Sequence, residues 1–205
     1  MKNLKLKSIA LLIGCILSHF LSYSQDEVKI GKQIWTTKNL NVSKFRNGES
    51  IPEAKTESEW KAYGEAEEAA WHYLKFDKAN GKKYGKLYNW YAVNDKRGLA
   101  PNGFHPPKDE EWTQLIEFLG GKTPASVKLK SKEGWINFLN YESGGGTNSS
   151  GFSALPSTGP PYLGEYWSTS DKPVYYKILG DNDIFRTEDT NSSKKGGLSV
   201  RCVKD

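Results

Sequence analysis

The segment at positions 144–159, GGGTNSSGFSALPSTG, holds the residue types best suited to chemistry in this 205-residue chain. A phosphate-binding loop needs a lysine directly after its second glycine, and no lysine follows Gly151. A nucleophile elbow around Ser153 needs glycine at the fifth motif position, where this chain has Leu155. We therefore predict a rigid structural turn, permitted by its glycines and anchored in the core by Phe152 and Leu155.

Histidines and glutamates are the next candidates for acid/base or metal chemistry. Neither His72 nor His105 has a second histidine or an acidic cluster at ligand spacing, so we predict structural roles, with His105 bonded to the backbone of its loop. Glu65, Glu67 and Glu68 could supply acid and base carboxylates, but a glycosidase needs its pair on opposite sides of a cleft. We interpret this charge run as a solvated face.

Oxygen-rich side chains at Asp181-Asn182-Asp183, with Glu188 and Asp189 beyond, are of the kind that binds calcium. The spacing of an EF-hand loop is absent, and Asp-Asn-Asp is also a common turn sequence. Asp181 and Asp183 are therefore the calcium candidates, beside the prediction that the chain takes no cofactor and has no catalytic residues.

Aromatic side chains gather in the C-terminal half, where they could bind a ligand or fill the core. Aromatic faces stack on sugar rings and are favoured at protein interfaces. We predict that Trp167 belongs to the core, and that Tyr162, Tyr166 and Tyr175 are the candidate ligand-binding residues.

The N-terminus is typical of an exported protein. Basic residues at 2–7 precede an apolar run at 9–21, which is shorter than the about 20 residues needed to span a bilayer. We predict a signal peptide over 1–24 and a single domain over 25–205, with no transmembrane span in the mature chain. The alternative is a lipoprotein signal in which Cys15 becomes the lipidated first residue.

Charge and cysteine content exclude further classes. The chain has 29 Lys+Arg and 24 Asp+Glu, and removing a leader with three lysines and no acids lowers the formal net charge from +5 to +2. This balance argues against nucleic acid, which needs a concentrated basic face. Cys202 remains as the single cysteine, so we predict no internal disulfide and a small buried hydrophobe at this position.

Periodicity in the N-terminal half predicts both helices and strands. Alternation in 28–42 predicts a strand, a turn and a second strand. Thr56 and Glu59 form a capping-box pattern that predicts a short helix over about 57–63. The aromatic segment 82–94 is ambiguous between a strand and a short helix.

The clearest element is an amphipathic helix that begins near Asp109 and ends at Gly120-Gly121. Its apolar residues follow the i, i+3, i+4, i+7 spacing of one buried face. Beyond residue 121 we expect only short strands and loops, without a helix of any length. Helices in one half and strands in the other predict an α+β fold rather than alternating βαβ units.

Several runs in this order resemble the Fibrobacter succinogenes major paralogous domain family, and together they span nearly all of the chain after the leader. The runs are IGKQIWTTKNLNV, SEWKAYGEAEEAAWHYLKFD, YGKLYNWYAV, APNGFHPPKDEEWTQLIEFLGG, SVKLKSKEGW, GTNSSGFSALPSTG, YWSTS and LSVRCVKD.

The resemblance implies a C-type-lectin-like fold, with short helices packed on small twisted antiparallel sheets and a loop-rich C-terminal half. It also implies an extracytoplasmic address, either secreted or at the cell surface. Many members have cysteine where Ala100 and His72 stand here, so family disulfides are not carried over. The positions implied to be structural signatures are Trp35, Tyr88, Trp90, His105, Trp112, Trp135, Phe152, Trp167 and Arg201.

The absence of a catalytic set favours a non-enzymatic binding module, with a glycan or an envelope protein as its partner. The alternatives are an enzyme acting on surface polysaccharide, which carboxylates converging in one cleft would support, and a purely structural envelope component. The sequence leaves the oligomeric state and the ligand open.

Overall fold

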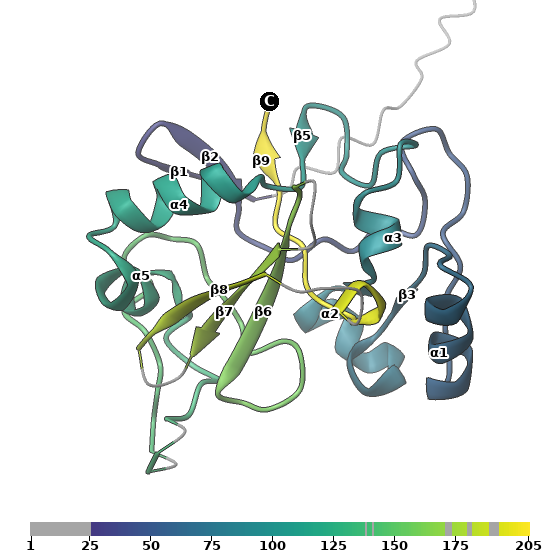
Figure 1. Cartoon of the computed structure of the whole chain (residues 1–205). Coiled ribbons are helices and arrows are strands. Elements are labelled where there is room, and N and C mark those ends of the chain that lie inside the picture. Colours follow the sequence, from purple (N-terminus) through teal and green to yellow (C-terminus); the bar gives the residue numbers. More distant parts are fainter. Residues whose placement is uncertain (1–25, 138, 141, 171–173, 180–181, 189–192) are drawn as a thin grey trace, which may run out of the picture.

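The computed structural model describes residues 26–137, 139–140, 142–170, 174–179, 182–188 and 193–205, and the statements below concern these residues. Short helices and short strands are interspersed along the chain (Figure 1). The elements are β1 Glu27–Ile30, β2 Gln33–Thr36, α1 Glu57–Glu65, β3 Trp71–His72, η1 Leu74–Phe76, η2 Lys78–Asn80, α2 Gly81–Tyr84, β4 Leu87–Tyr88, α3 Trp90–Val93, β5 Phe104–His105, α4 Asp109–Phe118, α5 Lys122–Leu129, β6 Leu163–Ser168, β7 Val174–Leu179, β8 Ile184–Glu188, η3 Ser193–Lys195 and β9 Val203–Lys204.

The strands form small antiparallel sheets, as the α+β prediction requires. One sheet has the order β1-β2-β9-β5, a second pairs β3 with β4, and a third has the order β6-β7-β8. The predicted N-terminal hairpin is confirmed, with Val28 opposite Trp35. Val203 pairs with both Trp35 and His105, so the C-terminal strand lies inside the first sheet.

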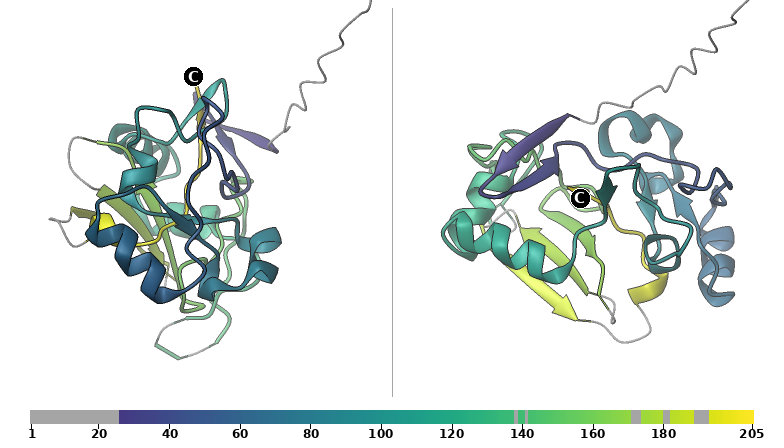
Figure 2. Two further views of the ribbon diagram at one scale, coloured as in Figure 1. Left: turned by 90° about the vertical axis from the view of Figure 1, so that its right-hand side faces the viewer. Right: turned by 90° about the horizontal axis from the view of Figure 1, so that it is seen from above.

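The β6-β7-β8 sheet separates two hydrophobic cores. Tyr166 packs against Trp112 with ring centroids 5.8 Å apart, in the core that also receives α4 and α5. The next residue, Trp167, belongs to a second core that contains Tyr88. Successive side chains of a strand point to opposite faces, so this sheet sends aromatic rings into a core on each side. Figure 1 and Figure 2 show α4 and α5 on one side of it and α1 and α3 on the other.

The helices predicted in the N-terminal half are present. The Thr56 hydroxyl accepts a hydrogen bond from the Glu59 backbone N–H at 3.2 Å, and α1 runs two residues beyond the expected end. Helix α4 buries Trp112 and Leu115, as its spacing predicts. The ambiguous segment 82–94 contains both helix and strand. It includes the last residues of α2, then all of β4 and α3.

The prediction that no helix follows residue 121 is wrong, because α5 occupies Lys122–Leu129. Pro124 lies in its first turn, where a backbone N–H has no helical acceptor and its loss costs little. Ala125 and Leu129 lie one turn apart and are both buried. Burial of this face outweighs the weak helix propensity of the serine and valine between them.

The glycine run that opens the 144–159 segment serves close backbone packing. A Cβ atom on Gly145 would lie 2.2 Å from the Lys132 carbonyl oxygen, and one on Gly146 would lie 2.4 Å from that of Val127. Downstream, Phe152 is fully buried and contacts the Trp35 ring edge-on at 5.6 Å. The predicted structural turn is therefore present, and its glycines permit this approach.

Arg201 is fully buried and ties this turn to the N-terminal hairpin. Its Nη1 donates to the carbonyl oxygens of Thr36 (2.8 Å) and Phe152 (2.6 Å), and its Nη2 donates to that of Ser153 (2.9 Å). Its Nε donates to Asn39 Oδ1 at 2.7 Å. These acceptors are neutral, so the charge is stabilised by dipoles and by the Phe152 ring, 4.4 Å away.

Replacing Arg201 by Met should destabilise the protein by about 3–5 kcal/mol, because it leaves several buried oxygens without donors. Arg201→Lys should recover only part of this loss, since a single ammonium cannot reach all the acceptors on two separate segments. Urea unfolding monitored by tryptophan fluorescence measures both, with Lys32→Met on the surface as a control. A loss below about 1 kcal/mol for Arg201→Met would contradict this role.

His72 lies in a second buried contact, between α1 and the segment after β3. Its ring centroid lies 4.4 Å from that of Trp60 and 4.6 Å from that of Phe76, and its Nδ1 hydrogen-bonds the Tyr73 carbonyl at 2.9 Å. Gly197 packs on the other ring nitrogen so closely that a Cβ there would lie 2.3 Å from Nε2. Burial lowers the pKa of His72 from 6.5 to about 4, so the folded protein holds it neutral.

This pKa predicts a loss of stability in acid. Between pH 6.5 and about 4 the unfolded chain binds a proton at His72 that the folded chain does not, so stability falls as the pH falls through this window. The contribution of His72 should amount to about 2–3 kcal/mol by pH 4. Urea unfolding of wild type and His72→Gln at several pH values isolates it, since other groups titrate in both. Parallel pH curves for the two proteins would contradict the assignment.

Candidate functional site

A cavity of about 610 Å³ opens beside α3. Its walls come from four segments that are distant in sequence: 50–52, the turn after α1 at 67–69, the stretch 90–97, and Lys194 of η3. Side chains of acidic, basic, amide and aromatic types all reach it.

Asn89, the N-cap of α3, holds two of these walls together. Its Oδ1 accepts hydrogen bonds from the backbone N–H groups of Ala92 (3.0 Å) and Ala70 (3.1 Å). Its Nδ2 donates to the Glu68 carbonyl at 2.7 Å. One buried amide thus caps the helix and fixes the 67–69 turn beside it.

Trp90 and Tyr91 supply the aromatic part of the cavity wall. Trp90 is mostly buried, yet its Nε1–H has no partner among the described residues. The indole groups of Trp112, Trp135 and Trp167 all donate to backbone carbonyls. A buried donor without an acceptor costs about 1–3 kcal/mol, so the indole N–H of Trp90 is an unfavourable feature of a residue that lines the cavity.

Glu67 reaches the cavity from a strained backbone position. Helix α1 ends in a Schellman motif, in which Glu68 N–H donates to the Tyr63 carbonyl (3.0 Å) and Glu67 N–H donates to that of Gly64 (3.3 Å). Glu67 occupies the left-handed position of this motif with φ of 56°. Glycine is the usual residue there, so the chain bears a conformational cost to keep a carboxylate at this position.

Asp95 and Arg97 form an ion-paired rim. Arg97 Nη2 lies 2.7 Å from Asp95 Oδ2, and its Nη1 lies 2.7 Å from Glu49 Oε2. The guanidinium also stacks over the Phe45 ring at 4.0 Å. Hydrogen bonding to Arg97 lowers the pKa of the Asp95 carboxyl, so Asp95 stays ionised at neutral pH.

The remaining charges at the cavity are available to a ligand. Lys195 pairs with Glu65 at 2.9 Å and so anchors η3 against α1, which places the preceding Lys194 at the cavity. Within the described part of the chain, Lys194, Glu67 and Glu68 make no ion pair. The cavity therefore combines ring surface with several acceptors and donors, the groups that bind a hydroxyl-rich ligand.

The tyrosines predicted to bind ligand are mostly inside the protein. Tyr166 is fully buried and its hydroxyl donates to the Leu155 carbonyl at 3.0 Å. Tyr175 is 9% exposed and packs edge-on against Trp167. The expectation of exposed ring faces fails for both, because the sheet that carries them packs against a hydrophobic core on each side. Tyr162 is half-buried in the loop before β6.

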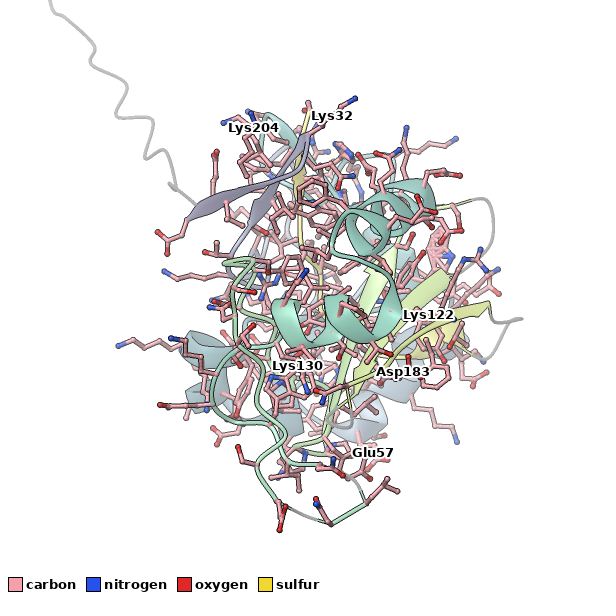
Figure 3. The ribbon with its side chains drawn as sticks, turned by 90° about the vertical axis from the view of Figure 1, so that its left-hand side faces the viewer. Lys32, Glu57, Lys122, Lys130, Asp183 and Lys204 are labelled. Carbon is pink, nitrogen blue, oxygen red and sulfur yellow. The ribbon has the colours of Figure 1, made fainter. Side chains whose placement is uncertain are left out.

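Of the two calcium candidates, the structure describes Asp183 but not Asp181. Asp181 lies outside the described residues, and Asp183 Oδ1 accepts a hydrogen bond from the Ile184 backbone at 2.7 Å. Between them, Asn182 Oδ1 accepts a hydrogen bond from the buried ammonium of Lys130 at 2.7 Å. Lys130 and Asp183 are labelled in Figure 3. A cation from the protein itself thus occupies this turn. Within the described residues, no group of three or more His, Cys, Asp or Glu side chains is placed to hold a metal.

His105 is paired with carboxylates, whereas a backbone partner was expected. Its Nδ1 lies 2.7 Å from Asp205 Oδ1, and its Nε2 lies 2.9 Å from both carboxylate oxygens of Glu111. The two acids approach opposite ring nitrogens, so they cannot share one metal ion with this ring. The imidazole instead connects α4 to the C-terminal strand. The other signature positions, Trp35, Tyr88, Trp90, Trp112, Trp135, Phe152, Trp167 and Arg201, are buried.

The other candidate groups also have structural partners. Ser153 Oγ accepts a hydrogen bond from Asn148 Nδ2 at 2.7 Å, while the Ser153 carbonyl accepts from Arg201. Cys202 is fully buried, and burial raises the pKa of its thiol to about 12, which confirms the predicted buried hydrophobe. Within residues 26–205, the helices that the structure describes are all too short or too polar to cross a bilayer. Cys15 and the rest of the predicted leader lie outside the described residues.

Sequence reasoning missed most of the cavity. It grouped Glu65, Glu67 and Glu68 as a solvated run, although Glu67 and Glu68 line the cavity. The aromatic density of the 82–94 segment was a usable signal for Trp90 and Tyr91. Nothing in the sequence places Lys194 beside them, because that contact depends on the packing of η3 against α1 and α3.

Comparison with known proteins supports the resemblance that the sequence runs carry. A search of curated proteins found no match, and a search of solved structures found none either. The family model described as the Fibrobacter succinogenes major domain matches residues 28–204, and the chain therefore belongs to this family.

Proposed function

We propose that this protein is an exported, non-enzymatic binding module of the cell envelope, and that its ligand is a glycan bound in the cavity beside α3. The observation that carries the proposal is the composition of that cavity: two aromatic residues, two carboxylates without ion pairs, one amide and one lysine around about 610 Å³. Sugar rings stack on aromatic faces, and their hydroxyls both donate and accept hydrogen bonds.

The local structure supports a binding role for this cavity. The Glu67 backbone strain, and the Trp90 indole N–H without a partner among the described residues, are unfavourable features of two neighbouring segments that line the cavity. Such features concentrate at functional sites, where a ligand interaction offsets them. A C-type-lectin-like fold and an extracytoplasmic address, secreted or lipid-anchored, are part of the proposal and rest on the family resemblance and on the basic, apolar N-terminus.

Hydrolysis of surface polysaccharide is the second candidate, because Glu67, Glu68 and Asp95 converge on one cavity. Retaining and inverting glycosidases need one carboxyl that is protonated at working pH. The pKa of Asp95 is lowered by Arg97, which disqualifies it as the general acid. Release of reducing ends by wild type, lost in Glu68→Gln, would favour the enzyme over the binding module.

We predict that Tyr91→Ala weakens glycan binding by about 5- to 30-fold, because it removes an aromatic face worth about 1–2 kcal/mol. A glycan-array screen identifies the bound glycan, and titration calorimetry then gives its affinity for wild type and variant. The matched control is Tyr162→Ala, which removes a half-buried tyrosine outside the cavity and should change the affinity less than about twofold. Binding should persist in chelator, since the cavity offers hydrogen bonds without a metal.

Loss of binding in Tyr162→Ala but not in Tyr91→Ala would move the site to the loop before β6. Loss in chelator would instead implicate the turn that contains Asp183. Absence of any bound glycan would overturn the proposal and leave an envelope protein as partner, or a purely structural role.

Replacing Glu67 by glycine should have opposite effects on the stability of the protein and on its affinity for the glycan. Glu67→Gly should raise the stability by about 1 kcal/mol, because glycine adopts the left-handed conformation without strain, yet it should weaken glycan binding. Glu67→Gln keeps the strain and removes only the charge, so it should weaken binding without the gain in stability. Thermal unfolding and calorimetry on the same samples measure both effects. A Glu67→Gly protein with unchanged affinity would exclude this carboxylate from the site.

A further inference from the structure

A concentration of positive charge lies away from the cavity, in the segment KFDKANGKK at 75–83. It contains four lysines and one acid within nine residues. The structure arranges them over η1, η2 and α2, and all four lysine side chains are exposed: Lys75, Lys78, Lys82 and Lys83.

The lysines are not neutralised within the molecule. Two exposed lysines elsewhere on the surface do pair with carboxylates, Lys38 with Asp26 and Lys204 with Glu27. Among the described residues, the four lysines of this segment make no ion pair. The single acid, Asp77, uses its carboxylate to cap η2, accepting from the Ala79 backbone N–H at 2.9 Å.

Their arrangement is locally unfavourable. Residues 78–84 form one continuous helical stretch, in which Lys78 and Lys82 are four positions apart on one face. Like charges at this spacing repel, so local folding alone does not explain the pattern.

The support beneath the lysines is rigid. Lys75 and Phe76 both have positive φ, 56° and 57°, and this turn directs the Phe76 ring inward to stack on His72. Asn80 Nδ2 donates to the Leu74 carbonyl at 2.8 Å. The ring of Tyr73 lies so close to Gly81 that a Cβ there would be 2.3 Å from it. A surface held in this way presents its charges with little loss of backbone entropy on binding.

We propose that this face, the lysine face, binds an acidic polysaccharide of the cell envelope. Charge complementarity selects a polyanion, and lysine ammonium groups suit carboxylates that need no bidentate donor. A membrane surface is a poorer fit, because the exposed large hydrophobic residues of the described chain, Phe118, Leu139 and Phe185, belong to other segments. The choice of polysaccharide over nucleic acid rests on the extracytoplasmic address proposed above, but it is independent of the cavity.

The test measures binding of the purified protein to polygalacturonate, with neutral mannan as the uncharged polymer. The patch variant carries Lys75→Glu, Lys78→Glu, Lys82→Glu and Lys83→Glu. The control variant has the same change in net charge at dispersed exposed lysines: Lys29→Glu, Lys32→Glu, Lys122→Glu and Lys132→Glu. A second patch variant, in which the same four lysines are changed to glutamine, replaces the first if charge reversal prevents folding. Thermal unfolding of each protein shows whether it is folded.

Wild type should bind polygalacturonate and not mannan, and its affinity should fall at least about tenfold between about 50 mM and 500 mM NaCl. The patch variants should lose at least about tenfold in affinity, and the control variant less than about threefold. Tyr91→Ala should bind polygalacturonate as wild type does, even if it has lost its glycan, which separates this proposal from that of the cavity.

Three results would overturn the proposal: equal losses in patch and control variants, loss of polygalacturonate binding in Tyr91→Ala, or tighter binding to anionic phospholipid vesicles or to duplex DNA than to polygalacturonate. The last result would assign the lysine face to a membrane or a nucleic acid.

Discussion

The burial of one guanidinium, that of Arg201, is the constraint on which the rest of the structure depends. An arginine inside a protein must find acceptors for its donors, because unpaired buried charge is among the most costly defects a fold can have. Here the acceptors belong to the N-terminal hairpin region and to the turn at Phe152 and Ser153. The guanidinium can make these bonds only when the two acceptor segments meet the C-terminal segment that carries Arg201. The buried arginine therefore couples the beginning, the middle and the end of the domain.

Two other buried cations work in the same way. Lys130 is fully buried and donates to the Gly144 carbonyl at 2.5 Å, 5.5 Å from the centre of the Trp135 ring. Lys86 is 3% exposed, donates to Ser43 Oγ, and lies 3.9 Å from the centre of the Trp71 ring. Burial lowers the pKa of Lys86 to about 8, because the charged ammonium loses its hydration inside the protein. With Cys202 buried and unpaired, these buried cations, bonded to carbonyls and packed on aromatic rings, link loops in this fold in the way that disulfides do in other domains.

The placement of the cavity follows from the two-core arrangement. The β6-β7-β8 sheet contributes aromatic rings to both cores. The cavity of about 610 Å³ lies where α1, α3 and η3 meet, at the margin of the second core. The short elements there end in caps and turns, and such termini bring polar side chains to a surface without burying their backbone groups unpaired.

The sequence alone determined the family, the N-terminal hairpin, and helices α1 and α4, because periodicity and caps depend on residues close in sequence. It also determined that the 144–159 segment lacks the residues of a phosphate loop or an elbow. Helix α5 was not predictable in this way, since burial of Ala125 and Leu129 overrides a weak local propensity. Only the tertiary structure decided that Tyr166 and Tyr175 are interior, because a strand pattern cannot reveal that both faces of its sheet are covered. It alone brought Lys194 beside Tyr91 and Glu67, since contacts between segments about a hundred residues apart are set by packing and leave no local pattern.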